Sequence, residues 1–138
     1  MSDEQTVIEL PKAWALSNLT VHFEGDLRDE AHPFAANVVA YRRLDVEPNS
    51  AFGPVVEHDL EVAEAAADAF EVIERDVRED GADVECVSTA GGHKLRHLTV
   101  YRNIGGAIYT LIGTHQDDRF EKVRSDIVAI ASRVLGAL

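Results

Sequence analysis

Cysteine, tryptophan and methionine each occur only once in this 138-residue chain, and long apolar runs are missing altogether. The single cysteine, Cys86, excludes an intramolecular disulfide and gives no sign of an oxidising compartment. No stretch approaches the roughly 20 apolar residues of a membrane-spanning helix. The first residues lack both the basic and the apolar region of a signal peptide. The sequence therefore predicts a cytoplasmic protein without a membrane span.

Basic residues are also scarce. There are 13 lysines and arginines against 25 aspartates and glutamates, which gives a formal net charge of −12. Nucleic acids and anionic membrane surfaces are therefore unfavourable partners, because binding to either depends on basic groups. Twelve of the carboxylates fall between Glu57 and Glu85, where only Arg75 and Arg78 oppose them. This acidity suits a cationic partner, and it equally suits a surface that is charged only for solubility.

The length and the hydrophobic fraction of 46% are those of one soluble globular domain over residues 1–138. Alternation of apolar and polar residues predicts strands over residues 7–10, 16–24, 34–44, 70–78, 84–89, 93–102 and 107–115. Helical spacing predicts one helix from about Pro54 and a second from Phe120 to the C-terminus. Proline suits the first helical position because its missing N–H costs nothing there. A charged loop is expected over residues 25–33.

The last third of the chain carries the clearest pattern. Two alternating segments joined by a turn at residues 103–106 predict a β-hairpin. The second of them is apolar on both faces, which is typical of a central strand that is covered on both sides. Asp117 or Asp118 is then expected to cap the terminal helix. The element order predicts an α+β fold in which an antiparallel sheet of about six to seven strands is packed by two helices.

Several short strings follow one another in an informative order. They are LPKAW at residues 10–14, NVV at 37–39, FEVIE at 70–74, DGA at 80–82 and GAIYTL at 106–111. In this order they resemble the PsbP-like superfamily, and within it small bacterial DcrB-like proteins and Eag-type secretion chaperones. The resemblance covers almost the whole chain. It implies an α/β/α sandwich around an antiparallel sheet, generally without enzymatic activity, that acts as a binding module.

Residues that could carry chemistry form no recognised motif. Six histidines are present, but His93 and His97 would lie about 13 Å apart along a strand, too far for one metal ion. His97 and His115 fall on paired strands and could meet across the ladder. The glycine pairs lie between strands rather than before a helix, where a phosphate-binding loop would place them. We expect no metal and no cofactor, and we expect Cys86 to be a buried apolar residue.

The function expected from these observations is that of a non-enzymatic protein-binding or adaptor module. A chaperone for a secreted or membrane-destined partner is one form that such a module takes in the family. A cationic or apolar segment of the partner would dock on the exposed part of the sheet or beside the acidic helix. The candidate partner surface comprises Glu57, Glu61, Glu64 and Asp68. A homodimer remains open.

The alternative is a small-molecule-binding protein or an enzyme. Its pocket would lie between the sheet and a helix, lined by His97, Tyr101, Tyr109 and His115. A deep pocket with converging polar groups would favour this alternative. A broad apolar groove would favour the binding module.

Overall fold

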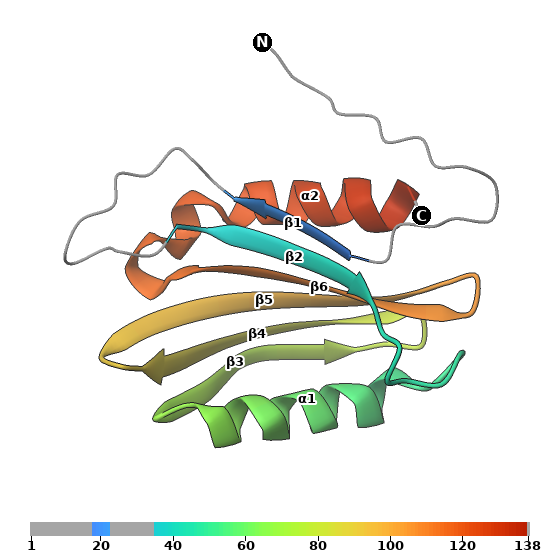
Figure 1. Cartoon of the computed structure of the whole chain (residues 1–138), viewed down its shortest axis with the longest axis horizontal. Coiled ribbons are helices and arrows are strands. Elements are labelled where there is room, and N and C mark those ends of the chain that lie inside the picture. Colours follow the sequence, from blue (N-terminus) through green and yellow to red (C-terminus); the bar gives the residue numbers. More distant parts are fainter. Residues whose placement is uncertain (1–17, 23–34, 138) are drawn as a thin grey trace, which may run out of the picture.

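A single antiparallel sheet of six strands forms the centre of the part of the chain that the computed structural model describes, residues 18–22 and 35–137 (Figure 1). The strands are β1 (Asn18–His22), β2 (Asn37–Arg42), β3 (Ala69–Val77), β4 (Gly81–Ala90), β5 (His93–Ile104) and β6 (Ala107–Gln116), arranged in the order β1-β2-β6-β5-β4-β3. Each strand predicted from residue 16 onward is confirmed, with its ends shifted by a few residues. The strand predicted over residues 7–10 and the loop predicted over residues 25–33 lie outside the described residues.

Strand β6 lies inside the sheet, between β2 and β5, which confirms the central position predicted from its two apolar faces. The turn that precedes it fixes its register. Gly105 and Gly106 have φ values of 61° and 93°, left-handed conformations that suit a two-residue hairpin turn and that favour glycine. Ile104 consequently pairs with Ala107, and all the other pairs of β5 with β6 follow from this one.

Two helices cover opposite faces of the sheet. Helix α1 (Phe52–Ala66) packs against β3 and β4, whereas α2 (Arg124–Ala137) packs against β5 and β6. Consecutive residues of a strand point to opposite faces. Val100 of β5 belongs to the core beneath α2, and its neighbour Tyr101 belongs to the core beneath α1. The molecule is therefore an α/β/α sandwich of the α+β class, as expected.

Both helices begin elsewhere than predicted. Helix α1 begins at Phe52, so Pro54 is its third residue and not its first. Proline is still tolerated there, because the N–H groups of a first turn have no partner within the helix. The predicted cap at Asp117 or Asp118 is wrong. These residues start a 3₁₀ helix, η1 (Asp117–Lys122), and α2 begins only after it.

The core beneath α2 is apolar and closely packed. Its buried members are Ala36, Val38, Ala40, Val100, Tyr109, Leu111, Phe120, Val123, Ile127, Ala131 and Leu135. At Gly113 of β6 the helix comes very near to the sheet, and an added Cβ would overlap Cγ2 of Ile127. Glycine is therefore required at this position by the distance between α2 and β6.

A buried carboxylate joins the sheet to η1 and α2 on the same face. Glu85 of β4 accepts hydrogen bonds from Arg124 at 2.6 and 2.8 Å and from Arg96 at 2.7 Å. These bonds, that of Arg124 first, hold the pKa of Glu85 below its usual value although burial acts in the opposite direction. Arg96 also donates to Asp117 of η1 at 2.7 Å. The network fixes where α2 starts relative to β4 and β5.

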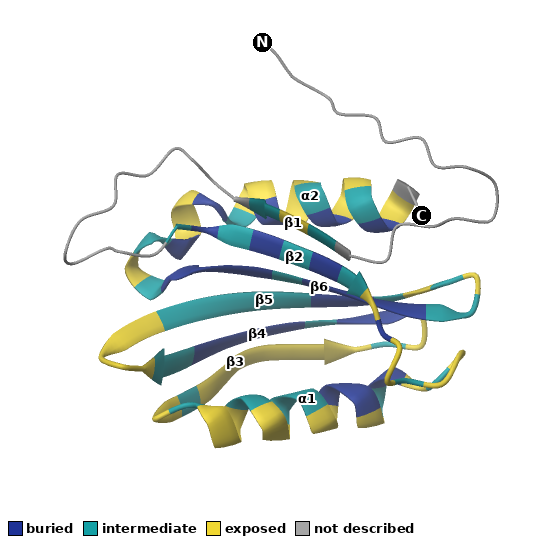
Figure 2. Ribbon diagram, in the orientation of Figure 1, coloured by how far each residue is buried: buried dark blue, intermediate teal, exposed yellow. Residues whose placement is uncertain are grey.

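Each helix covers only a part of its face. Figure 2 shows buried residues at the start of α1 and an exposed β3 along almost its whole length. Strand β3 is the last of the sheet. A bulge between Val72 and Glu74 interrupts the regular spacing of β3, and the strand carries charged side chains. Both features disfavour pairing of this edge with another strand. On the face that carries α1, parts of β5, β6 and β2 extend beyond the helix, and a groove is left there.

Replacing Gly113 by alanine tests the packing of α2 on the sheet. We expect Gly113→Ala to lower the free energy of unfolding by about 1–3 kcal/mol, because the new Cβ overlaps Ile127 in a filled core. Gly53→Ala is the matched control, since an added Cβ in the first turn of α1 meets nothing within 4 Å. Urea unfolding followed by circular dichroism measures both. Equal stabilities of the two variants would contradict this packing.

Candidate functional site

A groove runs along the sheet-facing side of α1 and opens to solvent. Its volume is about 530 Å³. It is lined by Tyr41, Asp45, His58, Asp59, Leu60, Val62, Ala63, Ala66, Ala67, Phe70, Val84, Cys86, Ser88, Ala90, His97, Thr99, Tyr101 and Ile112. Most of these side chains are apolar. The sheet and α1 therefore present a mostly apolar surface to a ligand in the groove.

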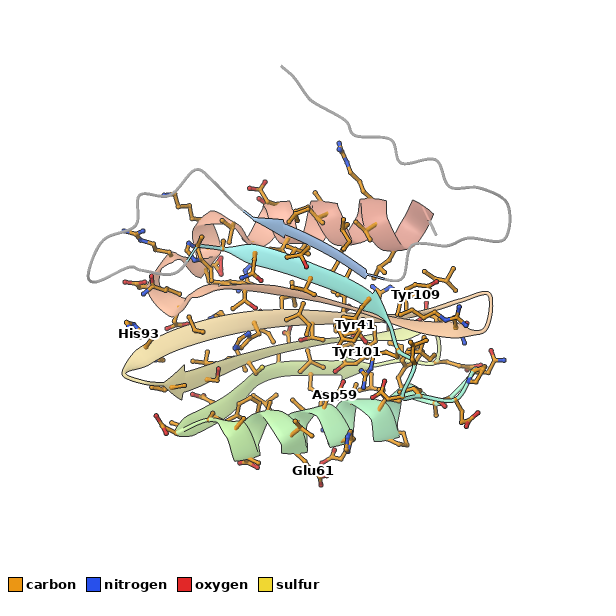
Figure 3. The ribbon with its side chains drawn as sticks, in the orientation of Figure 1. Tyr41, Asp59, Glu61, His93, Tyr101 and Tyr109 are labelled. Atoms are coloured by element: carbon orange, nitrogen blue, oxygen red, sulfur yellow. The ribbon has the colours of Figure 1, made fainter. Side chains whose placement is uncertain are left out.

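Strand and helix periodicity explain which residues line the groove. Cys86 and His97, which line the groove, are cross-strand neighbours on β4 and β5, so they lie on the same face of the sheet, the one toward α1. Thr114 of β6, the next neighbour in this row, borders the lining on the same face. Asp59 and Ala63 are four residues apart on α1 and thus lie on the same side of the helix. Figure 3 shows Asp59 on the side of α1 that faces the sheet, near Tyr101.

One end of the groove is built around a buried arginine. Arg43 follows β2 directly, and its side chain is only 5% exposed. Its Nη1 and Nη2 donate to the two carboxylate oxygens of Asp59 on α1, at 2.7 and 3.0 Å. Its Nε and Nη2 donate to Asp45, at 2.9 Å each. Nη1 also lies 3.3 Å from Thr110 Oγ1 on β6, and the hydroxyl of Tyr101 on β5 donates to Asp59 at 2.8 Å.

The contacts of this arginine cluster perturb the pKa values of its members. The hydrogen bond from Arg43 holds the pKa of Asp45 below its usual value. Burial, and after it the negative charge of Asp59, raises the pKa of the Tyr101 hydroxyl. The pKa of Arg43 is raised as well, chiefly by its hydrogen bond to Asp45. At neutral pH the tyrosine is neutral and the cluster holds two carboxylates for one guanidinium.

A row of polar side chains crosses the floor of the groove. Ser88 Oγ of β4 lies 2.8 Å from Nε2 of His97 on β5, and Thr114 Oγ1 of β6 lies 3.0 Å from Nδ1 of the same ring. Both ring nitrogens therefore have a hydroxyl partner. Burial lowers the pKa of His97, because a charged imidazole would lose its hydration there. The ring is neutral at physiological pH and belongs to the floor.

The polar groups of this floor differ from those of a serine–histidine–aspartate triad. The contact of Ser88 with His97 is that of a nucleophile with its base, but Thr114 stands where a carboxylate would stabilise the imidazolium. Burial raises the pKa of Cys86 to about 11, so its sulfur remains a thiol. The backbone N–H groups of central strands bond to their neighbours and are not available to an oxyanion. Within the described ranges, no three acidic, histidine or cysteine side chains gather into a metal site.

The structure brings together two of the four residues predicted to line a pocket. His97 and Tyr101 both line the groove. Tyr109 and His115 do not belong to it, which corrects the prediction. Odd-numbered residues of β5 pair with even-numbered residues of β6, so Tyr109 and His115 point to the face that carries α2. For the same reason His97 and His115 do not meet across the ladder.

The predicted acidic surface lies outside the groove. Glu57, Glu61 and Glu64 are exposed on the solvent side of α1, and Figure 3 shows Glu61 directed away from the sheet. Glu57 accepts a hydrogen bond from Arg75 of β3 at 2.9 Å. Asp68 is exposed just beyond the helix, where it accepts the backbone N–H of Gly91 at 3.3 Å. Docking of a partner on this surface stays a prediction.

Sequence reasoning missed the arginine cluster altogether. Arg43 and Asp59 are 16 residues apart, and no periodic pattern connects an arginine after a strand with an aspartate inside a helix. The one available signal was Asp59 itself, a carboxylate close to the apolar stripe of a helix, where charge is rarely left without a partner.

Comparison with known proteins shows which fold this groove belongs to. No family model and no curated protein matches the chain. Among solved structures, PA94 of Pseudomonas aeruginosa, a protein of unknown function, superimposes with a TM-score of 0.63 at 16% identity. The match covers 86% of this chain and 83% of that one. The solution structure of the cyanobacterial PsbP of Synechocystis gives 0.53 at 16% identity and covers 86% and 81%.

The fold is PsbP-like. Identity this low establishes the fold alone and leaves the finer group within it open. In this PsbP-like sandwich, neither helix of the described ranges has the length and apolar character that crossing a bilayer would require.

Replacing Arg43 tests how much the structure depends on the arginine cluster. We expect Arg43→Met to lower the free energy of unfolding by about 3 kcal/mol, because it leaves the carboxylate of Asp59 on α1 without its charged partner. Arg75→Met is the matched control. It removes an equal charge from a pair of exposed side chains and should cost less than about 1 kcal/mol. Urea unfolding compares the two, and equal losses would contradict a special role for Arg43.

Proposed function

We propose that this protein is a non-enzymatic binding module that holds an apolar segment of a protein partner in the groove beside α1. The observation that carries the proposal is the groove itself: it is open and mostly apolar. An apolar groove that stays open to solvent can bury apolar side chains of a partner. Its occupant would lie on the uncovered part of the sheet.

The polar groups of the groove support binding over chemistry. The hydroxyl of Tyr101 is engaged by Asp59, and the imidazole of His97 is engaged on both sides. A site that recognises a small polar ligand would instead direct such groups at the ligand. The exposed rim adds to the apolar character, since Val62 of α1 is 55% exposed. An apolar side chain of the partner would shield it from water.

A chaperone for a secreted or membrane-destined partner is the form of this function that we favour. Such partners carry apolar segments that must be kept from aggregating until they reach their destination. The order of short strings that resembles DcrB-like and Eag-type proteins supports this form. A groove along the side of a helix suits an extended or helical apolar segment equally well.

An enzyme or a small-molecule-binding protein is the second candidate, and one contact favours it. Ser88 Oγ lies within hydrogen-bond distance of Nε2 of His97 at the floor of the groove. We prefer the binding module because the partner of His97 Nδ1 is the hydroxyl of Thr114. A catalytic triad has a carboxylate at this position, which stabilises the charged imidazolium.

Filling the groove tests the proposed function. We expect Ala63→Phe to weaken the binding of a fluorescently labelled peptide of leucine and alanine by about tenfold or more, because the phenyl ring occupies the volume that the peptide needs. Ala65→Phe is the matched control on the same helix, since Ala65 is exposed and does not line the groove. Fluorescence anisotropy measures both affinities.

A second pair of variants tests the same groove independently, in case Ala63→Phe disturbs the fold. Val62→Asn changes the exposed rim of the groove, and Val128→Asn changes an equally exposed valine, 52% accessible, on α2. Only the first should weaken binding. Failure of the wild-type protein to bind the peptide, or equal effects of the paired variants, would refute the proposed function.

A further inference from the structure

We propose that the groove selects apolar segments that carry a cationic residue, a lysine or an arginine, beside the apolar stretch. The inference rests on the proposed function and adds the charge of the occupant to it. The observation behind it is the balance of charge at the end of the groove where Asp45 and Asp59 lie.

Arg43 neutralises only one of the two carboxylates that it binds. Its guanidinium donates to both Asp45 and Asp59, which leaves the cluster with one negative charge in excess. Among the described residues that line the groove there is no lysine or arginine. His58 also lines this end, beside the carboxylates. The charge that this end presents at neutral pH is therefore negative.

The three charged groups of the cluster are not equally accessible to solvent. Their different exposures make this end of the groove more negative toward an incoming ligand. The side chain of Arg43 is 5% exposed, that of Asp59 is 26% exposed and that of Asp45 is 60% exposed. The positive charge is thus buried behind the negative ones. An incoming cation would meet the exposed carboxylate of Asp45 first, at the rim of the groove, where the attraction between opposite charges is strongest at low ionic strength.

The opposite end of the groove differs in character. Ala66, Ala67, Phe70 and Ala90 line it, and none of them can carry a charge. Asp68 lies just beyond, where it holds the backbone of Gly91, and it is not part of the lining. The groove is thus apolar at one end and negative at the other. An apolar segment with one flanking cation is the occupant that complements both ends.

Two peptides of equal length test the selection. They share one block of leucine and alanine and differ at a single flanking position, which holds lysine in one and norleucine in the other. We expect the wild-type protein to bind the lysine peptide about fivefold more tightly at low ionic strength and pH 8, a ratio typical of one partly screened charge pair. Added salt should reduce the ratio.

Asp45→Asn and Glu47→Gln locate the selecting charge. Each removes one negative charge from the β2–α1 connection, but only Asp45 lines the groove and bonds to Arg43. We expect the preference for lysine to vanish in Asp45→Asn, where the cluster becomes neutral, and to persist in Glu47→Gln. Asp45 is exposed enough for its variant to fold, and circular dichroism verifies this.

The possible failures are distinguishable. Equal binding of both peptides by the wild-type protein would overturn the charge selection and leave the proposed function standing. A preference that survives Asp45→Asn or disappears in Glu47→Gln would also overturn it, because another carboxylate would then be responsible. If neither peptide binds to the wild-type protein, the charge selection and the proposed function are both overturned.

Discussion

The position of α1 depends on one guanidinium group. Arg43 directs its donors at Asp59 on the helix, at Asp45 in the connection and at Thr110 in the sheet, and Tyr101 completes the cluster through Asp59. Breaking a buried ion pair is costly, whereas keeping one adds little net stability. The cluster is therefore better understood as a positional constraint. It sets the distance of α1 from the sheet and hence the width of the groove.

The open groove follows from how the two helices divide the sheet. Helix α2 lies on β5 and β6, with Gly113 allowing the close approach, and its start is held by Glu85. Helix α1 lies on the other face over β3 and β4. Because the helices are offset, the middle of the sheet remains partly open on the side of α1. The apolar residues there line the groove that we propose as the binding surface.

The sequence allowed the architecture to be predicted, because strand alternation and helical stripes are local properties. The two apolar faces of β6 correctly indicated an interior strand. The face of Tyr109 could have been predicted as well. With the two-residue turn at Gly105 and Gly106, as with the four-residue turn expected, odd-numbered residues of β5 pair with even-numbered residues of β6, so Tyr109 and Tyr101 lie on opposite faces. Asp117 does not cap α2, because η1 lies between them, and its carboxylate accepts a hydrogen bond from Arg96 of β5.

The candidate site was only half predictable for a similar reason. His97 and Tyr101 could be assigned to a helix-facing surface, because they lie four residues apart on one strand. Arg43 could not be assigned, since its partners come from three other elements and the path of the β2–α1 connection brings them together. The twelve carboxylates between residues 57 and 85 could be counted from the sequence, but not the fact that Asp59 alone among them lines the groove.

The central claim is that an apolar segment lies in the groove beside α1. Methyl NMR during titration with the lysine-flanked apolar peptide tests it most directly. The account predicts chemical-shift changes at the methyl groups of Val62, Ala63 and Ile112, which line the groove, and none at Val128, which is equally exposed on α2. Changes at Val128 with none in the groove would contradict it.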